Sequence, residues 1–414
     1  MGSFSTPLSG LTAAQQQLQS VSNNLANIDT DGYKTQTLTF ADLFSQTGVV
    51  NGSGDPIQVG SGVAVASTVN NFTEGTLSST SVASNMAVSG NGFFVTQNAN
   101  GTLDYTRTGD FTTNNAGQLV TPSGETVLGY PAVNGVVNTS AALQPLQVGS
   151  VTSPAVASTT VGITANLDSN TAVGGTAPSS SLSIYDSLGQ AHTLTVNYTM
   201  TAPGNWTYTV TVPSADVVAG TTGNTTVGSG TLVFNGSGQL DTTNSTMTPI
   251  SIPTFADGAT SPQALSGPFG TATSPTITQT ALASATSATT TDGFASGTLK
   301  TYTVQPDGTI EGTFTSGNTI ALGQVAVASF TNTQGLVSTG NNSFQATAAS
   351  GLSVIGQAGT GGRGTIVGGS VEQSNVDIAT EFAKLIVAQQ AYSANAKSIT
   401  TFSTLSQATL AMIQ

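Results

Sequence analysis

The sequence FSTPLSGLTAAQQQLQSVSNNLANI, residues 4–28, repeats apolar residues at intervals of three, four and seven. This spacing places them on one side of an α-helix, which turns once every ~3.6 residues. Pro7 is compatible with a helix only in the first turn, so we expect the helix to begin near Ser5 and to end by Gly32. The apolar stripe of this helix consists of Phe4, Leu8, Leu11, Leu18, Val21, Leu25 and Ile28.

The end of the chain repeats this pattern. From Ile378 onward the apolar residues follow alternating steps of four and three, which predicts a second helix over 376–413. Asn375 is the expected N-cap, and Asp377 is favourable in the first turn because a carboxylate there interacts with the positive end of the helix dipole. The second stripe consists of Ile378, Phe382, Leu385, Tyr392, Ala396, Ile399, Leu410 and Ile413.

Two apolar stripes of this length need partners, because an isolated amphipathic helix leaves its apolar side in water. We expect the two ends, 1–28 and 372–414, to form one coiled-coil-like helical domain that packs against the ends of neighbouring subunits. The alternative, in which the two helices pack only on each other within one chain, stays open. The residues expected at the polymerisation interface are Leu8, Leu11, Leu18, Val21, Leu25, Ile28, Ile378, Phe382, Leu385, Tyr392, Ile399 and Leu410.

The sequence between the two ends is typical of β-structure. It is rich in Gly, Ser, Thr, Asn and Val and poor in the helix formers Glu, Lys and Arg. Short apolar or alternating runs are separated by the turn sequences NANG (98–101), NNAG (114–117), DSLG (186–189), NGSG (235–238) and PDG (306–308), which is the pattern of β-hairpins. The predicted fold class is therefore mainly β with α-helical termini.

Shifts in composition predict two nested β-domains between the helical ends. Connectors rich in Ser, Thr and Ala occur near 148–156 and 284–291, so we expect a first β-domain that is interrupted by an inserted outer one. The expected boundaries are 72–147 and 286–356 for the first β-domain, 148–285 for the inserted β-domain, and 29–71 and 357–371 for an extended linker region.

The charge composition argues against several classes of partner. Only 6% of the residues are charged, and six Lys and Arg against 19 Asp and Glu give a net charge of −13. So few cations cannot neutralise many phosphates, and we expect neither a nucleic-acid partner nor a membrane partner. The chain has no Cys, and its first residues lack the basic and apolar segments of a signal peptide. Its Ser-, Thr- and Gly-rich composition is nevertheless typical of exported surface proteins.

Residues suited to catalysis or metal binding are scarce. The only histidine, His192, lies in the alternating run AHTLTVNY, and we expect it on the surface of a sheet rather than as a general base. The acidic residues are scattered singly, so an enzyme would need a carboxylate pair that the sequence does not reveal. The sequence GTGGRG (359–364) matches a dinucleotide-binding pattern, but the extended run after it does not predict the required helix. We therefore expect no catalytic residue, no cofactor and no metal ligand.

Three stretches resemble the bacterial flagellar rod and hook protein family. SVSNNLANIDTDGYKTQTLTF (20–40) is similar to its N-terminal signature, and SNVDIATEFAKLIVAQQAYSANAKSITT (374–401) to its C-terminal end. NMAVSGNGFFVTQ (85–97) and LDYTRTGDFTTNNAGQLVTPSG (103–124) resemble its first β-domain. The motif residues that carry the match at the two ends include Asn23, Asn24, Asn27, Gly32, Tyr33, Lys34, Asn375, Gln389 and Asn395.

The resemblance implies a structural subunit and no enzyme. Rod subunits of the family lack an inserted β-domain, so the segment 148–285 favours the hook over the alternative, a distal rod subunit. A hook subunit would polymerise into a curved helical tube that acts as a universal joint and transmits torque from rod to filament.

The resemblance also implies partners and a location. The implied partners are further copies of the chain, rod subunits, hook cap and hook–filament junction proteins, and the flagellar type III export apparatus. The implied location is extracellular, in the hook of the basal body, reached without a cleaved signal peptide. The alternative from another class is a secreted adhesin or surface-layer protein, which accounts for the β-domains and gives no reason for two helical ends.

Overall fold

The computed structural model describes residues 4–43, 46–50, 56–217, 222–271 and 274–412. The chain divides into two compact units. The first unit comprises Met1–Gly149, Tyr302–Gly312 and Ile320–Gln414, and the second comprises Ser150–Thr301 and Thr313–Thr319. The second unit is thus inserted into the sequence of the first.

Helices form at both ends of the first unit. α1 (Ser5–Ala26) carries Pro7 in its first turn, and α3 (Ile378–Ala411) is the longest helix among the described residues. The predicted fold class, mainly β with helical termini, is confirmed. The prediction of Asn375 as the N-cap of α3 is wrong: Asp377 is the cap, and its Oδ1 accepts a hydrogen bond from the backbone N of Thr380 at 2.6 Å.

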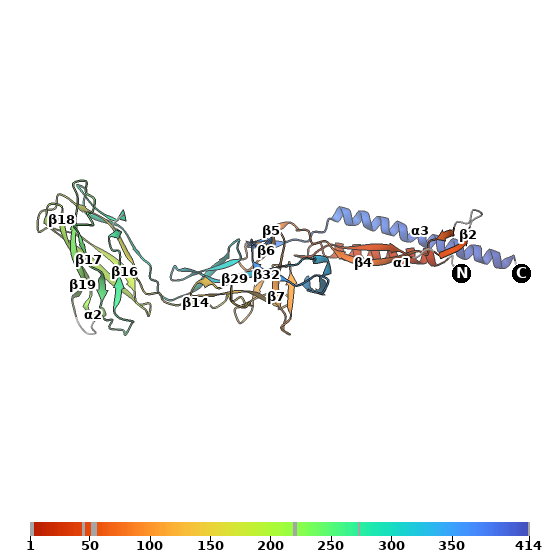
Figure 1. Cartoon of the computed structure of the whole chain (residues 1–414), viewed down its shortest axis with the longest axis horizontal. Coiled ribbons are helices and arrows are strands. Elements are labelled where there is room, and N and C mark those ends of the chain that lie inside the picture. The colour runs from red at the N-terminus through yellow and green to blue at the C-terminus, as the bar shows by residue number, and fades with distance from the viewer. Residues whose placement is uncertain (1–3, 44–45, 51–55, 218–221, 272–273, 413–414) are drawn as a thin grey trace. The chain divides into compact units, whose positions relative to one another are not determined.

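Part of the segment expected to be an extended linker is a β-hairpin. β1 (Gln36–Asp42) pairs antiparallel with β4 (Val63–Asn70), and both strands lie along α1 (Figure 1). The linker expectation for 29–71 is therefore wrong there, because TLTF and VAVASTV alternate in the way that favours a ladder although glycines surround them. β2 (Gln46–Val50) and β3 (Pro56–Val59) form a second antiparallel pair.

The segment 357–371 is not a linker either. β33 (Thr365–Gly368) pairs with β6 (Met86–Ser89), and β34 (Ser370–Glu372) pairs with β5 (Leu77–Ser79), so this segment is part of the β-body of the first unit. The remaining strands of that body are β7 (Phe93–Gln97), β8 (Leu103–Thr106), β9 (Thr112–Thr113), β10 (Leu119–Val120), β11 (Thr126–Val133), β12 (Val136–Val137), β13 (Gln144–Pro145), β29 (Thr319–Ser329), β30 (Val337–Gly340), β31 (Ser343–Gln345) and β32 (Val354–Gln357), with the short 3-10 helix η1 (Thr333–Gly335).

The sheet of the first unit has the strand order β29-β11-β7-β8-β31-β30. Alternate residues of its central strands point to opposite sides, so it is packed on both faces. On β7, for example, Phe94 belongs to one hydrophobic cluster, while Phe93 and Val95 belong to another. β27 (Gly297–Val304) and β28 (Thr309–Phe314) have residues in both units.

The second unit has its own sheets and its own core. A five-stranded sheet has the order β16-β17-β18-β19-β20, and a three-stranded sheet has the order β25-β15-β26. Because β26 pairs with β15, this unit continues past residue 285, the predicted end of the inserted domain. Its elements are β14 (Thr152–Ser153), β15 (Val161–Asp168), β16 (Thr176–Tyr185), β17 (Ala191–Ala202), β18 (Asn205–Pro213), α2 (Ser214–Val217), β19 (Asn224–Val233), β20 (Thr246–Met247), β21 (Ile250–Ile252), β22 (Gln263–Leu265), β23 (Gly270–Thr271), β24 (Ser274–Pro275), β25 (Ile277–Thr280) and β26 (Ala285–Thr291).

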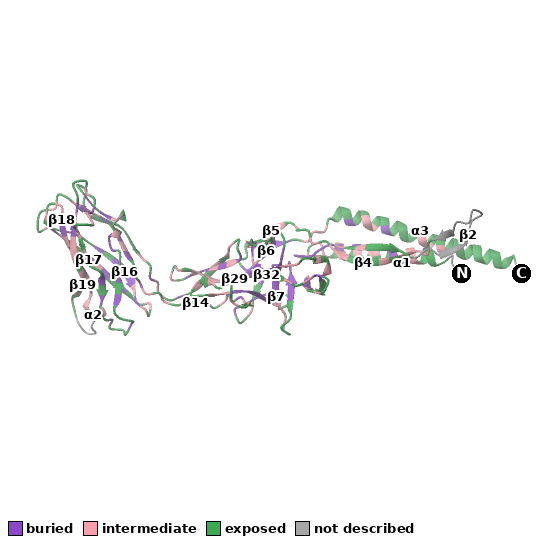
Figure 2. Ribbon diagram, viewed as in Figure 1, coloured by how far each residue is buried: buried purple, intermediate pink, exposed green. Residues whose placement is uncertain are grey.

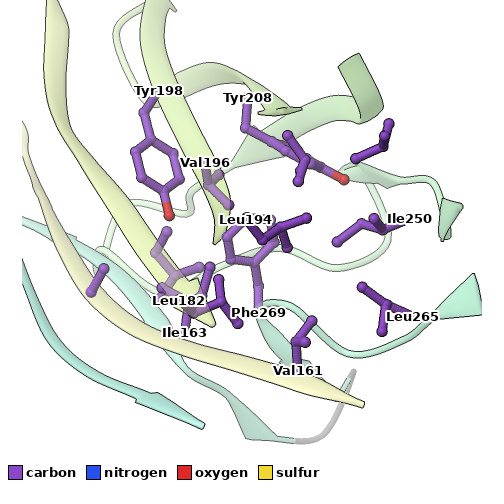
Figure 3. Packing of buried hydrophobic residues seen from close by; sticks show 14 of the residues in the cluster. Val161, Ile163, Leu182, Leu194, Val196, Tyr198, Tyr208, Ile250, Leu265 and Phe269 are labelled. Atoms are coloured by element: carbon purple, nitrogen blue, oxygen red, sulfur yellow. The ribbon is translucent and has the colours of Figure 1, made fainter. Parts of the chain in front are cut away.

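The core of the second unit is one continuous hydrophobic cluster. Figure 3 shows Leu194 and Val196 from β17 beside Ile163 from β15, with Phe269 among them. Trp206, the only tryptophan of the chain, is also fully buried in this cluster.

The turns between strands follow the sequence signals. Gly101, Gly117, Gly189, Gly238 and Gly308 all have positive φ angles between 75° and 86°, a conformation that glycine adopts without steric cost. In all five of these turns an Asn or Asp side chain also accepts a hydrogen bond from a backbone amide in the turn or directly after it. The hairpin predictions are therefore confirmed at these positions.

Candidate assembly site at the helical ends

Helices α1 and α3 pack side by side in antiparallel orientation (Figure 1). Near the end of α1, Asn24 Nδ2 lies 3.1 Å from Glu381 Oε2, which belongs to the first turn of α3. At the start of α1, the ring of Phe4 meets the ring of Phe402 edge-on, with centroids 6.0 Å apart. The end of α1 therefore lies at the start of α3, and the start of α1 lies near the other end of α3, so the helices run antiparallel.

Small residues allow the two helices to approach closely. A Cβ atom added to Gly10 would lie 2.9 Å from the side chain of Asn395, which is closer than ordinary contact. Ala388 on α3 is fully buried, and Ala13 and Ala14 on α1 are buried as well. The inner side of the helix pair is therefore closed.

The pairing leaves much of the predicted stripe of α3 and the start of the stripe of α1 exposed (Figure 2). Leu8 is 54% exposed and Phe382 is 48% exposed, and Ile386 and Val387, outside the predicted stripe, are 56% and 63% exposed. Among the predicted interface residues, Val21 is buried, Leu11, Leu18, Leu25, Ile28, Leu385 and Ile399 are half-buried, and Leu8, Ile378, Phe382, Tyr392 and Leu410 are exposed.

Pairing within one chain, the alternative that the sequence left open, therefore occurs but does not cover these side chains. We call Leu8, Ile378, Phe382, Ile386, Val387, Tyr392, Leu405 and Leu410 the exposed helix residues.

Asn24 joins both helices to β1. Its buried side chain donates from Nδ2 to Gln36 O at 2.8 Å and to Glu381 Oε2, and its Oδ1 accepts from Gln36 N at 2.9 Å and from Tyr33 Oη at 3.0 Å. An aspartate here would lack both donors. Burial, with a contribution from the charge of Glu381, raises the pKa of Tyr33 and keeps its hydroxyl protonated as a donor. Lys384 Nζ donates to Glu381 Oε1 at 2.7 Å and supplies the counter-charge.

Glu372 is the centre of a buried charge cluster at the base of the helices. Lys34 Nζ lies 2.5 Å from its Oε1, Arg107 Nη1 lies 3.1 Å from its Oε2, and all three side chains are almost fully buried. Lys34 also donates to Thr73 O at 2.8 Å, and Gly75 N donates to Glu372 Oε1 at 2.8 Å. Burial lowers the pKa of Lys34, and the charge of Glu372 opposes this effect. Without Glu372, two buried cations would lack a counter-ion.

Arg107 extends this cluster to the β-body. Its Nη1 donates to Val88 O at 3.0 Å and its Nη2 donates to Gly90 O at 2.5 Å, both near β6. The guanidinium also lies over the ring of Phe93, 5.5 Å from the centroid. Arg107 thereby holds Glu372, the last residue of β34, against the first β-domain.

Asn375 ties together three segments that are distant in the sequence. Its Oδ1 accepts from Thr35 N at 2.8 Å, and its Nδ2 donates to Asn71 O at 2.8 Å and to Thr73 O at 3.0 Å. Asn375 therefore connects the segment before α3 with the residues just before β1 and just after β4.

Gly32 makes the turn between α1 and this region. Its φ is +71°, and its backbone N donates to Glu372 O at 2.7 Å. A Cβ at this position would lie 2.6 Å from Thr108 N, so only glycine fits without displacing backbone. We call the set that fixes the helices to the body the helix junction: Asn24, Gly32, Tyr33, Lys34, Arg107, Glu372, Asn375 and Glu381.

The other motif residues have local roles or lie elsewhere. Asn27 Nδ2 donates to Asn23 O at 2.9 Å, and Asn23 Nδ2 donates to Tyr33 Oη at 3.2 Å, at the end of α1. Asn395 lies against Gly10 in the helix pair, and Gln389 is exposed on α3.

Models of four flagellar protein domains match successive parts of the chain. The flagella basal body rod protein model matches residues 4–34, and the flagellar hook protein FlgE/F/G D1 domain matches 87–166. The flagellar basal body protein FlaE D2 domain matches 158–294, and the flagellar basal body rod FlgEFG protein C-terminal model matches 367–412.

Curated relatives match almost the whole chain. The flagellar hook protein FlgE of Escherichia coli strain K12 is 33% identical over 420 residues, which cover 96% of each chain. The chain belongs to the flagellar hook protein family. The hook protein FlgE of Salmonella typhimurium strain LT2 is 34% identical, over 96% of this chain and 97% of the relative. The resemblance inferred from the sequence is thereby confirmed, and the family is one of structural proteins of the flagellum.

The fold of this hook-family chain agrees with a solved hook protein. The crystal structure of Helicobacter pylori flagellar hook protein FlgE2 superposes with a TM-score of 0.52, covering 72% of this chain and 100% of that chain at 16% identity. Within the described ranges, no helix combines the length and the hydrophobicity that crossing a membrane requires.

The amide residues of the helix junction could be predicted from the sequence, but its charged centre was not. Glu372 and Arg107 were not among the predicted site residues, and Lys34 was named only as part of a motif. The scarcity of cations was the available signal. The chain has only six Lys and Arg, so each of them was a candidate partner for a buried carboxylate.

The expectation that His192 lies on a sheet surface is wrong. Its side chain is 5% exposed and faces the core side of β17, together with Leu194 and Val196. It stacks on Phe255 with ring centroids 4.7 Å apart and contacts two carboxylates, those of Asp186 and Asp216. The alternation of β17 already placed His192 on the same face as its apolar residues.

Proposed function

We propose that this hook-family chain is the structural subunit of the flagellar hook and polymerises through its terminal helices into a curved helical tube. The observation that carries the proposal is that α1 and α3 pair within the chain and still leave the exposed helix residues in water. Their burial between subunits would contribute about 25 cal/mol for each Å² of apolar surface. Self-association that does not close into a ring yields a helical tube.

The helix junction supports a role in transmitting torque. Buried, charge-assisted hydrogen bonds join α1, α3, the β1–β4 hairpin and the first β-domain at Lys34, Glu372 and Arg107. A load on the helices therefore passes to the β-body through short, directional contacts. Such a subunit suits a universal joint, in which the helical ends hold the tube together while outer contacts between subunits exchange.

The partners follow from this role. We propose that the chain binds further copies of itself, rod subunits at one end of the tube, and the hook cap and hook–filament junction proteins at the other. Export through the flagellar type III apparatus to an extracellular position suits a chain without cysteine, which passes in the unfolded state without disulfide rearrangement.

Deletion of the gene in its native host, followed by electron microscopy of purified basal bodies, tests this function. We expect bodies with a complete rod and no hook, and restoration of the hook when the gene is supplied in trans. A truncated rod would make the chain a rod subunit. Intact hooks and filaments would contradict a flagellar role and favour a surface adhesin.

A further inference from the structure

The second unit has an unusual charge composition. Residues 150–299 contain six Asp, no Glu, no Lys and no Arg, together with the single histidine of the chain. Three of these six carboxylates, Asp186, Asp216 and Asp257, gather around His192 although they come from separate segments. Residues 150–299 supply no Lys or Arg to compensate the negative charge of these carboxylates.

Asp186 is the buried carboxylate of the group. It follows β16, and its Oδ1 accepts hydrogen bonds from Leu188 N at 2.8 Å and Gln190 N at 2.9 Å. Its Oδ2 is therefore free of backbone partners and lies 3.1 Å from His192 Nε2. The side chain is thus held rigidly with one oxygen aimed at the histidine.

Asp257 brings a second carboxylate to the same point. It lies in the loop between β21 and β22, where one of its oxygens accepts from Ala259 N at 3.0 Å. One oxygen of Asp186, one oxygen of Asp257 and one ring nitrogen of His192 all lie within 4.8 Å of one another. Two carboxylates and one imidazole therefore converge from two segments that are distant in the sequence, the β16–β17 hairpin and the β21–β22 loop.

The Nδ1 side of the His192 imidazole also lies beside a carboxylate. Nδ1 of His192 is buried without a well-aligned hydrogen bond, and Asp216 Oδ2 on α2 lies 3.1 Å away. A carboxylate at this distance favours the tautomer with the proton on Nδ1, which turns the lone pair of Nε2 toward Asp186. A carboxylate behind a histidine in this way is the usual support of a metal-binding imidazole.

We infer that Asp186, His192 and Asp257 bind a divalent transition-metal ion of the zinc class in the second unit. Imidazole with two carboxylates suits zinc, and a water would complete four ligands, whereas magnesium and calcium prefer all-oxygen sites. Ligands about 2.0–2.2 Å from a tetrahedral zinc lie about 3.3 Å apart, close to the observed Nε2–Oδ2 separation of 3.1 Å. The ion would tie the β16–β17 turn to the β21–β22 loop.

The test uses the full chain, purified without a histidine tag, freed of metal with a chelator and titrated with zinc chloride by calorimetry. We expect one zinc per chain and a higher melting temperature of the second unit, read from the fluorescence of buried Trp206. Asp257→Asn is the main variant, because Asp257 is exposed and its loss does not open the core. It should weaken zinc binding by at least ~10-fold.

Asp241→Asn is the matched control, since Asp241 is a half-buried aspartate of the same unit outside this cluster. It should leave zinc affinity unchanged. His192→Gln removes the only imidazole of the chain and should abolish binding, with Trp206 fluorescence showing whether the unit still folds. Cobalt(II) in place of zinc should give the visible absorption of a four-coordinate ion in the parent chain and not in Asp257→Asn.

Three results would overturn the inference. The first is that zinc produces no heat and no change in melting temperature. The second is that Asp257→Asn binds zinc as tightly as the parent chain and the control. The third is that magnesium raises the melting temperature as strongly as zinc, which would make the cluster a nonspecific acidic surface.

Discussion

Glu372 is the charged centre of the helix junction. Its carboxylate accepts from Lys34, Arg107 and the backbone of Gly75, and its own carbonyl accepts from Gly32. A carboxylate that is fully buried between two cations is strongly destabilising to remove, because both cations then remain in a medium that solvates them poorly.

Replacement of Glu372 by Gln should lower the stability of the first unit by about 3–5 kcal/mol, since the two buried cations lose their counter-ion. Urea unfolding followed by far-UV circular dichroism of the helices measures this change. Trp206 belongs to the second unit and provides an internal reference, whose fluorescence transition should not move. Lys300→Gln, at an exposed cation, should change stability by less than about 0.5 kcal/mol. Equal effects of the two substitutions would contradict the role of the cluster.

Asp292 gives the second unit a defined sensitivity to acid. Burial alone would raise its pKa, but hydrogen bonds from Thr159 and Thr160 lower the pKa to about 2, from the ordinary 3.8. Between these values the unfolded chain binds more protons than the folded one. The stabilisation is therefore present above pH 3.8 and is lost as the pH falls toward 2.

In the parent chain, the loss of this stabilisation between pH 3.8 and 2 should lower the free energy of unfolding by about 1 kcal/mol, a figure reduced for solvent screening because the group is exposed. Asp292→Asn should not show this loss. Urea midpoints from Trp206 fluorescence, measured across this pH range, give the difference. Asp168→Asn, which changes an aspartate that accepts one backbone amide in the same unit, is the control. A pH dependence that is the same in Asp292→Asn as in the parent chain would rule out this assignment.

At the scale of single residues, the sequence predicted hydrogen-bonding amides better than charges. Asn24 and Asn375 stood out as parts of recognisable runs, whereas Glu372 lies in a short strand that is defined only by pairing with β5. The burial of His192 could be predicted from the alternation of β17, but its contacts with Asp216 and Asp257, which are far away in the sequence, could not. Contacts of that kind depend on chain topology, which residue spacing does not encode.

In the proposed hook, the helix pair is the element that would join the subunits. Gly10 of α1 lies against Asn395 of α3, Ala388 of α3 is fully buried, and larger apolar residues of both helices are exposed. Small residues between the helices permit a close approach, so the large ones remain available to other surfaces.

Ala388→Leu tests the close packing of this element. The added atoms have no room, because Ala388 is fully buried, and the substitution should destabilise the helix pair by about 1–3 kcal/mol. Thermal unfolding of the helices followed by circular dichroism measures the loss. Ala394→Leu changes the same residue type at an exposed position of α3 and should be nearly neutral. A neutral result for Ala388→Leu would show that the helices do not pair in this register.

The positions of both helices could be predicted from the period of their apolar residues, but the side that each helix presents to the other could not. The predicted stripe of α3 contains half-buried Leu385 and exposed Phe382, while the fully buried contact is Ala388, outside the stripe. A helix that contacts two different partners has two apolar sides, and a single period does not separate them. The β1–β4 hairpin was missed because its strands lie among glycines.

At the scale of the whole molecule, the chain consists of two units with separate cores. The core of the second unit is composed of residues from within that unit, including Trp206 and Phe269. Each unit therefore has the apolar burial that independent folding requires.

A fragment spanning Ser150–Thr301 should fold alone. We expect a cooperative thermal transition, followed by Trp206 fluorescence, within a few degrees of the corresponding transition in the full chain. The parent chain in the same buffer is the reference. A fragment with exposed Trp206 fluorescence and no cooperative transition would show that the second unit depends on the first.

The central claim is that the exposed helix residues join the subunits, and Phe382→Asp tests it most directly. Phe382 is 48% exposed, so a charge there should leave the folded monomer intact. The same charge should prevent polymerisation, because it would be buried without a partner between subunits. Purified parent and variant chains are compared by circular dichroism, to establish folding, and by electron microscopy under conditions in which the parent forms tubes. Folded monomers without tubes are the expected result, and normal tubes from the variant would contradict the account.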